Sequence, residues 1–214
     1  MTGATPRGRC ISFEGGEGTG KSTQARRLAE ALRAAGRTVV LTREPGGTAG
    51  AEAIRTLLVT GETDRWTAWS ETCLVGAARA DHTARVIAPA LARGDWVICD
   101  RFVDSTRAYQ GAGKGIADAA LLTLHTLAAG DLWPDRAYVL TLQADAGLAR
   151  AASRAGGELR FEGHDAAFHG RIAAFFAGLA IAEPARCRSF DAARTIDDLA
   201  AAIAADALTL AASC

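Results

Sequence analysis

The chain has 214 residues, enough for one α/β domain with a buried core and too few for a second full domain to be expected. Its 24 basic and 24 acidic residues cancel, which excludes the concentrated positive charge typical of general nucleic-acid or membrane-surface binders. No apolar run approaches the roughly 18 residues that span a bilayer, and no apolar targeting stretch precedes the first predicted strand. We therefore expect a cytoplasmic protein that binds neither nucleic acid nor membrane.

Five short apolar runs predict strands. In chain order these are Cys10–Phe13, Thr38–Leu41, Trp96–Cys99, Ala137–Leu142 and Cys187–Phe190. The segments between them are rich in alanine, leucine and arginine with helical spacing, and they are Lys21–Ala35, Ala51–Val59, Thr67–Ala92, Ala117–Ala129, Asp145–Arg154, Asp165–Glu183 and Ile196–Ala212. This alternation indicates an α/β fold with a five-stranded parallel sheet flanked by helices, in a single domain over residues 1–214.

The first predicted strand runs into the loop FEGGEGTGKST, which opens the first predicted helix. In that setting the backbone N–H groups surround phosphates, the lysine reaches the outer phosphates, and the hydroxyl after it ligates Mg²⁺. The loop therefore predicts a nucleoside triphosphate site formed by Gly15, Gly16, Glu17, Gly18, Thr19, Gly20, Lys21, Ser22 and Thr23.

The third predicted strand ends at VICDR, which places Asp100 and Arg101 at the carboxyl edge of the sheet. Open α/β sheets bind ligands at that edge. We expect Asp100 to join Ser22 in holding the Mg²⁺ ion. The alternative is that Asp100 only caps the segment that follows it.

Two other classes of protein use the same phosphate loop. A GTPase switch should carry D-x-x-G after the third strand and N-K-x-D later, but the chain reads DRFVDS there and neither Lys21 nor Lys114 lies in such a setting. A motor or DNA-transaction ATPase usually has further domains or a basic face, and the composition favours neither. These exclusions leave a small kinase that acts on a small acceptor.

Three segments together, FEGGEGTGKST, TREPGG (Thr42 to Gly47) and DRFVDSTRAYQG (Asp100 to Gly111), resemble the thymidylate kinase family. PALARGDWVICDR and the later RFE add to the resemblance, which covers most of the chain. The family implies a P-loop nucleotide kinase fold, ATP·Mg²⁺ as phosphoryl donor, dTMP as acceptor and a homodimer formed through the Thr67–Ala92 helix.

The resemblance also implies an acceptor site. Arg43 and Arg101 would clamp the monophosphate by bidentate bonds, with Arg55 as a further phosphate ligand. Pro45 would aim Arg43 through a cis bond or a tight turn. The dTMP-binding residues expected from the resemblance are Glu17, Arg43, Pro45, Arg55, Val75, Arg79, Arg101, Thr106, Tyr109 and Gln110.

Four of these residues would select the nucleoside. Arg79 would bind a thymine carbonyl, Thr106 and Gln110 would read the pyrimidine edge, and Tyr109 would pack where a ribose 2′-hydroxyl would lie. The sequence departs from the family at Val75, where a phenylalanine usually stacks on the base; Phe102 and Trp69 are the candidates that would replace this contact.

A lid is expected near Arg154–Gly163 because the segment is long and rich in glycine. Lys21, Arg101, Asp100 with Mg²⁺ and a lid arginine would position the reactants and neutralise charge in phosphoryl transfer. Arg160 is the chosen lid arginine and Arg154 the reserve, although Leu159 stands where the family often has an acid. This is the arrangement of bacterial-type enzymes, in which the lid and not the phosphate loop supplies the arginine.

Glu17 is an anion inside a phosphate-binding loop. We interpret it as a ligand of the acceptor sugar and its 3′-hydroxyl, which needs no positive partner within the loop. Two alternatives remain open at this point: a kinase for another deoxynucleoside monophosphate, suggested by Val75, and a catalytically idle nucleotide-binding protein.

Overall fold

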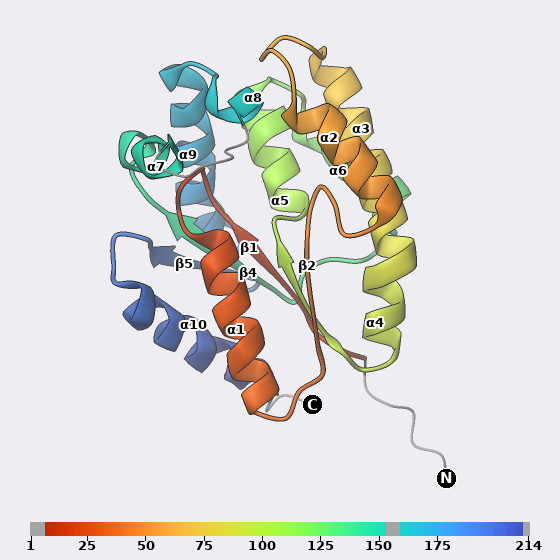
Figure 1. The fold of residues 1–214 in the computed structure, drawn as a ribbon, viewed down its shortest axis with the longest axis vertical. Coiled ribbons are helices and arrows are strands. Elements are labelled where there is room, and N and C mark those ends of the chain that lie inside the picture. The colour runs from red at the N-terminus through yellow and green to blue at the C-terminus, as the bar shows by residue number, and fades with distance from the viewer. Residues whose placement is uncertain (1–6, 153–158, 212–214) are drawn as a thin grey trace.

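The computed structural model describes residues 7–152 and 159–211. It contains one parallel sheet of five strands in the order β2-β3-β1-β4-β5 (Figure 1). The strands are β1 (Cys10–Glu14), β2 (Val39–Arg43), β3 (Trp96–Asp100), β4 (Arg136–Thr141) and β5 (Cys187–Asp191). All five predicted strands and the parallel pairing are thus confirmed, with bounds that differ by one or two residues.

The order of the strands determines where a ligand can bind. β1 lies at the centre of the sheet and pairs with β3 on one side and with β4 on the other. The connections that follow β1 and β3 therefore lead to opposite sides of β1. A crevice forms beyond the carboxyl ends of the strands at such a point. The register pairs Phe13 with Asp100 and Arg43 with Asp100, which brings the ends of β1, β2 and β3 to the same edge.

The helical segments are α1 (Lys21–Ala34), α2 (Ala49–Val59), α3 (Ala68–His82), η1 (Thr83–Ile87), α4 (Ala88–Ala92), α5 (Val103–Thr106), η2 (Arg107–Gly113), α6 (Asp118–Ala129), α7 (Ala144–Ala152), α8 (Leu159–Glu162), α9 (Ala166–Ala182) and α10 (Ile196–Ala211). Side chains cap several of them: Thr48, Thr67 and Asp165 accept the first free backbone N–H groups of α2, α3 and α9.

Within the predicted lid, Leu159–Glu162 form the short helix α8, and two other helical regions differ from the expectation. The predicted Thr67–Ala92 helix is interrupted by the π-helical turn η1, which precedes Pro89. Proline has no N–H to bond the carbonyl four residues earlier and its ring crowds that carbonyl, so the turn widens. The second difference is that α5 and η2 fold as helices in a stretch that carried motif residues but no helical prediction.

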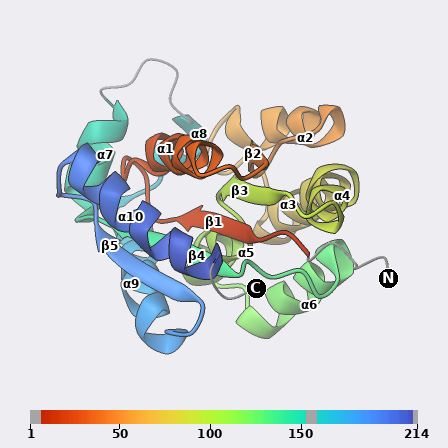
Figure 2. The same cartoon turned by 90° about the horizontal axis from the view of Figure 1, so that it is seen from below.

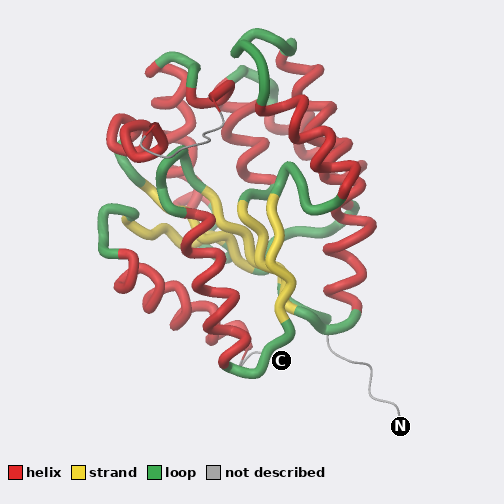
Figure 3. The backbone as a smooth tube through the Cα atoms, viewed as in Figure 1, coloured by secondary structure: helices red, strands yellow, loops and turns green. Residues whose placement is uncertain are grey.

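The core lies on both faces of the sheet (Figure 2). Alternate residues of β1 point to opposite sides: Ile11 and Phe13 pack with α1 and α10, while Cys10 packs with Leu91 of α4 and its neighbours. A third cluster joins β4 to α9 and η2. Because the sheet is covered on both sides, ligands are restricted to its edges and to the loops beyond the strand ends, which Figure 3 shows in green.

No helix among the described residues is long and apolar enough to cross a membrane.

Candidate active site

The phosphate loop lies between β1 and α1, as predicted. Gly15 and Gly18 have φ angles of 137° and 68°, a region in which side chains are strained. A Cβ atom on Gly18 would also stand 1.9 Å from the carbonyl oxygen of Gly147, because α7 packs directly on the loop. The chain therefore cannot carry a basic side chain at this position without moving α7.

Lys21 and Ser22 occupy the positions that the loop pattern requires. The Lys21 ammonium donates to the carbonyl of Gly16 at 2.6 Å and is almost fully buried. Burial, together with the positive charge of Arg101, lowers the pKa of Lys21 to about 8. The Ser22 hydroxyl donates to the Asp100 carboxylate, so the two predicted metal ligands are in contact. A polyphosphate beside Lys21 would supply the negative charge that favours its protonated form.

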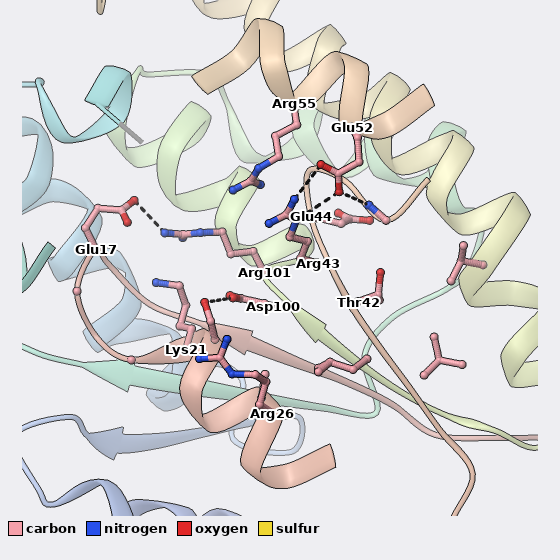
Figure 4. Close-up of a pocket in the computed structure, with 18 of the residues that line it drawn as sticks. Glu17, Lys21, Arg26, Thr42, Arg43, Glu44, Glu52, Arg55, Asp100 and Arg101 are labelled. Carbon is pink, nitrogen blue, oxygen red and sulfur yellow. Dashed lines mark hydrogen bonds and ion pairs between the residues drawn. The ribbon is translucent and has the colours of Figure 1, made fainter. Parts of the chain in front are cut away.

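A cleft of about 730 Å³ opens beside the loop, and we call it the phosphate cleft; Lys21, Ser22, Arg43, Arg55 and Asp100 are among its lining residues. The side chains of Arg43 and Arg55 extend toward each other there, and that of Arg101 extends toward Glu17 (Figure 4). Burial and the charges of Arg43 and Arg101 lower the pKa of Arg55 to about 10. Three guanidinium groups of different elements in one cleft form a strong site for a phosphate dianion.

Two of these arginines are held in place. Arg43 donates to Glu52 at 2.9 and 3.3 Å, and Glu52 also accepts the backbone N–H of Gly47. Arg101 is a non-glycine residue with φ of 70°, an unfavourable backbone conformation that directs its side chain back across the phosphate loop. Strained residues of this kind persist where the surroundings determine them and cluster at functional sites.

Glu17 has a positive partner from outside the loop. Its carboxylate accepts from Arg101 at 2.8 Å and from the Tyr109 hydroxyl at 2.6 Å. Burial alone would raise the pKa of Glu17, but the charges of Arg101 and Lys21 outweigh it and hold the pKa at about 2. The acid is therefore ionised at neutral pH. Its positive partner is not in the phosphate loop itself but is Arg101, the residue that follows β3.

A second space, which we call the inner cavity, adjoins the phosphate cleft and shares Glu17, Glu44 and Arg101 with it. Its lining residues are Glu17, Glu44, Pro45, Leu58, Val75, Arg79, Arg101, Phe102, Ser105, Thr106, Tyr109, Gln110 and Phe161. Eight of the ten residues predicted for the acceptor are in this set. The other two, Arg43 and Arg55, line the phosphate cleft.

Two polar side chains that line the inner cavity, Arg79 and Gln110, are held in place by hydrogen bonds to neighbouring protein groups. Arg79 donates to Glu44 at 2.8 Å and to the Thr106 hydroxyl at 2.9 Å, and its guanidinium lies over Phe102 at 5.0 Å. Gln110 donates through Nε2 to Glu71 at 2.9 Å. The Glu44–Pro45 peptide bond is cis, one of the two alternatives named for this turn. The anchoring leaves Arg79 and Gln110 as fixed, preorganised hydrogen-bonding groups.

The aromatic side chains of the cavity are Phe102, Tyr109 and Phe161, beside Val75. Phe161 comes from α8 and meets the Tyr109 ring edge-on, with centroids 5.7 Å apart. Trp69 is 53% exposed and does not line the cavity. Of the two aromatic residues considered as replacements at the base, only Phe102 lines the inner cavity.

Arg160, the predicted catalytic lid arginine, does not contact Lys21 or the phosphate loop; its side chain is bonded elsewhere. It is 1% exposed, forms an ion pair with Glu71 at 2.5 Å, and donates to three backbone carbonyls at 2.9 to 3.2 Å, those of Leu58, Glu62 and Thr63. The residue thus ties α8 to the end of α2 and to α3. Arg154 and the predicted lid residues 154–158 lie outside the described residues.

Sequence reasoning missed three carboxylates and one ring: Glu44, Glu52, Glu71 and Phe161. Glu44 adjoins Arg43 inside TREPGG, and Glu71 precedes Val75 and Arg79 by one and two helical turns, so motif and spacing placed both near the site. No motif or helical spacing in the sequence indicated that Glu52 pairs with Arg43. Among the described residues, no group of three histidine, cysteine, aspartate or glutamate side chains forms a metal cluster.

Comparisons with known proteins identify the family to which the chain is similar. The thymidylate kinase family model matches residues 13–203. A thymidylate kinase of Rhizorhabdus wittichii is 53% identical over 186 residues, which are 86% of this chain and 89% of that protein. One of Dinoroseobacter shibae is 51% identical over 97% of this chain and all of its own. The crystal structure of thymidylate kinase from Ehrlichia chaffeensis superposes with a TM-score of 0.72 at 35% identity, covering 86% of this chain and 93% of that one.

Proposed function

The chain belongs to the thymidylate kinase family, and from this premise we propose how its residues divide the work of the reaction. The protein is an ATP-dependent phosphotransferase that converts dTMP to dTDP and releases ADP. One observation carries the assignment of residues: Glu17 and Arg101 line both the phosphate cleft and the inner cavity. A donor on the loop and an acceptor in the cavity would therefore meet at these two side chains.

On the donor side, the loop from Gly15 to Thr23 would hold the phosphates of ATP with its backbone N–H groups and Lys21. Mg²⁺ would be held by Ser22 and Asp100. The donor set fits this ion, because a hydroxyl and a carboxylate in contact offer the hard oxygen ligands that it prefers. When bound, the ion would neutralise phosphate charge during transfer.

On the acceptor side, the dTMP phosphate would lie among Arg43, Arg55 and Arg101. The pyrimidine would extend into the inner cavity toward Arg79, Thr106 and Gln110, between Pro45, Val75 and the aromatic rings. Tyr109 and Glu17 would adjoin the sugar, and the Glu17 carboxylate would accept the 3′-hydroxyl proton in a hydrogen bond. The lining residues support this orientation, since Arg79 and Gln110 line only the inner cavity, whereas Lys21 lines only the phosphate cleft.

Catalysis would come from alignment and charge. Phosphoryl transfer needs little covalent help from the protein, so Lys21 and Arg101 would hold the donor and acceptor phosphates in line and stabilise the charge between them. A catalytic role for Arg160 requires that its side chain leave Glu71 and the three carbonyls it now contacts. We propose that it anchors α8 in the arrangement described above and reaches the phosphates only if α8 moves.

The test is an ADP-release assay with ATP, Mg²⁺ and one acceptor at a time: dTMP, dUMP, dCMP, dGMP or AMP. The expected result is the highest kcat/KM with dTMP, and loss of that turnover in Lys21→Met, which excludes a contaminating kinase. Preference for another acceptor contradicts the assignment of the inner cavity. ADP release that does not depend on any acceptor contradicts the assignment as a nucleoside monophosphate kinase.

We also propose that the enzyme is a cytoplasmic, single-domain homodimer. One sheet connects the three core clusters of the described residues, which supports the single domain. Leu57 of α2 and Trp69 of α3 are large apolar side chains left exposed on neighbouring helices, which supports a dimer contact there. Light scattering of wild type and Trp69→Glu tests the contact: a dimer that becomes a monomer is expected, and an unchanged mass contradicts it.

A further inference from the structure

Glu71 is a fully buried carboxylate with three donors, at the back of the inner cavity. It accepts from Gln110 Nε2 at 2.9 Å, from Lys114 Nζ at 2.8 Å and from Arg160 at 2.5 Å. The three donors come from η2, from the residue after it and from α8, so one side chain of α3 is bonded to two segments that lie far apart in the sequence. Glu71 itself is not among the residues that line the cavity.

The charge state of Glu71 is set by these partners. Burial alone would raise the pKa of Glu71, but the hydrogen bonds from Lys114 and Gln110 and the charges of Lys114 and Arg160 hold it below its usual range. An ionised carboxylate can only accept hydrogen bonds. The group that Gln110 turns toward Glu71 must therefore be its amide nitrogen.

This constraint fixes what Gln110 can offer to a ligand. With the nitrogen committed to Glu71, the carbonyl oxygen is the end of the amide left to face the cavity, where it acts as an acceptor. Arg79 is fixed nearby as a donor by Glu44 and Thr106. Of these two side chains, Arg79 thus presents a donor and Gln110 an acceptor.

The common pyrimidines differ in this pattern. Thymine and uracil offer a carbonyl at C4 and an N–H at N3, which complement a donor and an acceptor. Cytosine offers an amino group at C4 and an unprotonated N3, so both of its groups would face groups of their own kind. A buried polar group left without a partner is expensive, and hydrogen-bonding sites use that cost for discrimination.

We propose that Glu71 is the positioning residue that sets base choice: by holding the Gln110 amide in one orientation, it makes the cavity accept thymine and reject cytosine. The inference rests on the proposed function in one respect, that the pyrimidine occupies the inner cavity. It adds a residue that would touch no substrate and would act only through Gln110.

A double-mutant cycle read by equilibrium binding tests the inference. Calorimetry gives the affinities of dTMP and dCMP for wild type, Glu71→Gln, Gln110→Leu and the double variant. A glutamine at 71 can donate as well as accept, so the Gln110 amide is free to turn, and the dTMP preference should fall by about tenfold or more. In the Gln110→Leu background the same substitution should change the preference by less than about twofold.

Lys114→Met is the matched control, since it removes another partner of Glu71 without touching Gln110. Its dTMP preference should stay within about twofold of wild type. If the buried cations left by Glu71→Gln prevent folding, Glu71→Gln combined with Lys114→Met removes one of them and is compared with Lys114→Met alone. A merely structural role of Glu71 would weaken both nucleotides equally.

Three results overturn the inference: equal affinity of wild type for dTMP and dCMP, full preference in Glu71→Gln, or additive losses in the cycle. Binding is measured without turnover, so the two proposals fail separately. A protein that prefers dTMP through Glu71 but transfers no phosphate contradicts the proposed function alone. A protein that phosphorylates dTMP with full preference after Glu71→Gln contradicts this inference alone.

Discussion

Glu17 is an acid inside a phosphate-binding loop, and its surroundings explain how the loop tolerates it. Arg101 and Lys21 supply two positive charges, and the Tyr109 hydroxyl donates a hydrogen bond, so the negative charge of the carboxylate is compensated. These contacts support the proposal that Glu17 serves the acceptor rather than ATP.

Substitution of Glu17 should separate the two substrates. Glu17→Gln removes the charge that holds Arg101 and weakens the hydrogen bond offered to the sugar, so dTMP affinity should fall by about tenfold or more while ATP affinity changes less than about threefold. Binding titrations with each nucleotide measure this, and Glu30→Gln, an exposed site on α1, is the control. A loss mainly on the ATP side would overturn the interpretation.

Val75 tests whether the cavity lacks an aromatic contact. Phe102, Tyr109 and Phe161 already surround the space, so Val75→Phe would crowd it and the KM for dTMP should not fall. Ile181→Leu, an exposed site on α9, should leave that KM unchanged. A clear drop in KM for Val75→Phe would mean that the base lacks a stacking partner in the wild type.

At the scale of elements, α8 is a single turn whose position depends on Arg160. Such a short helix has little stability of its own, so the ion pair with Glu71 and the three carbonyl contacts determine where it lies. The same contacts hold Phe161 in the wall of the inner cavity, next to Tyr109. Loss of Arg160 should therefore affect folding stability as well as acceptor binding.

Arg160→Met should lower the free energy of unfolding by about 3 kcal/mol, because it removes one partner of a buried carboxylate and the guanidinium donors to three backbone carbonyls. Arg171→Met, an exposed arginine that also donates to two backbone carbonyls, should cost much less. Urea unfolding of both variants gives the comparison. Unchanged stability with a large loss of kcat would instead identify Arg160 as a phosphate ligand.

The elements also show how far the sequence alone could lead. Alternation of apolar runs and helical segments was enough to predict the sheet, and the motif positions were enough to predict eight residues that line the inner cavity. The sequence did not predict α5 and η2, because helices this short form by tertiary packing and carry little local signal. The placement of Arg160 was equally hidden, since its partners lie about a hundred residues away in the chain.

At the scale of the whole molecule, stability should depend on pH through Glu14, which joins the end of β1 to α5. It is fully buried and accepts from the backbone N–H of Phe102 and from the Ser105 hydroxyl. Burial, and then the negative charge of Asp104, raise the pKa of Glu14 from 4.5 to about 8. The folded protein therefore favours the protonated acid. The stability that this contributes is fully present below pH 4.5 and is lost as the pH rises through about 8.

Glu14→Gln removes this titration while keeping groups that can bond Phe102 and Ser105. The free energy of unfolding of wild type, relative to Glu14→Gln, should therefore decrease between pH 5 and pH 8. Denaturant unfolding at several pH values measures the difference. A difference that stays constant, or grows with pH, would show that Glu14 is ionised in the folded protein.

The central claim is that one phosphate loop serves two substrates in adjoining spaces. It is tested most directly by the affinity of a single molecule in which adenosine and thymidine are joined at their 5′ positions through five phosphates. If the phosphate cleft and the inner cavity form one continuous site, this compound should bind at least about 100-fold more tightly than ATP or dTMP, and more tightly than its adenosine–adenosine counterpart. Affinity no greater than that of ATP, with dTMP still able to bind beside it, would contradict the account.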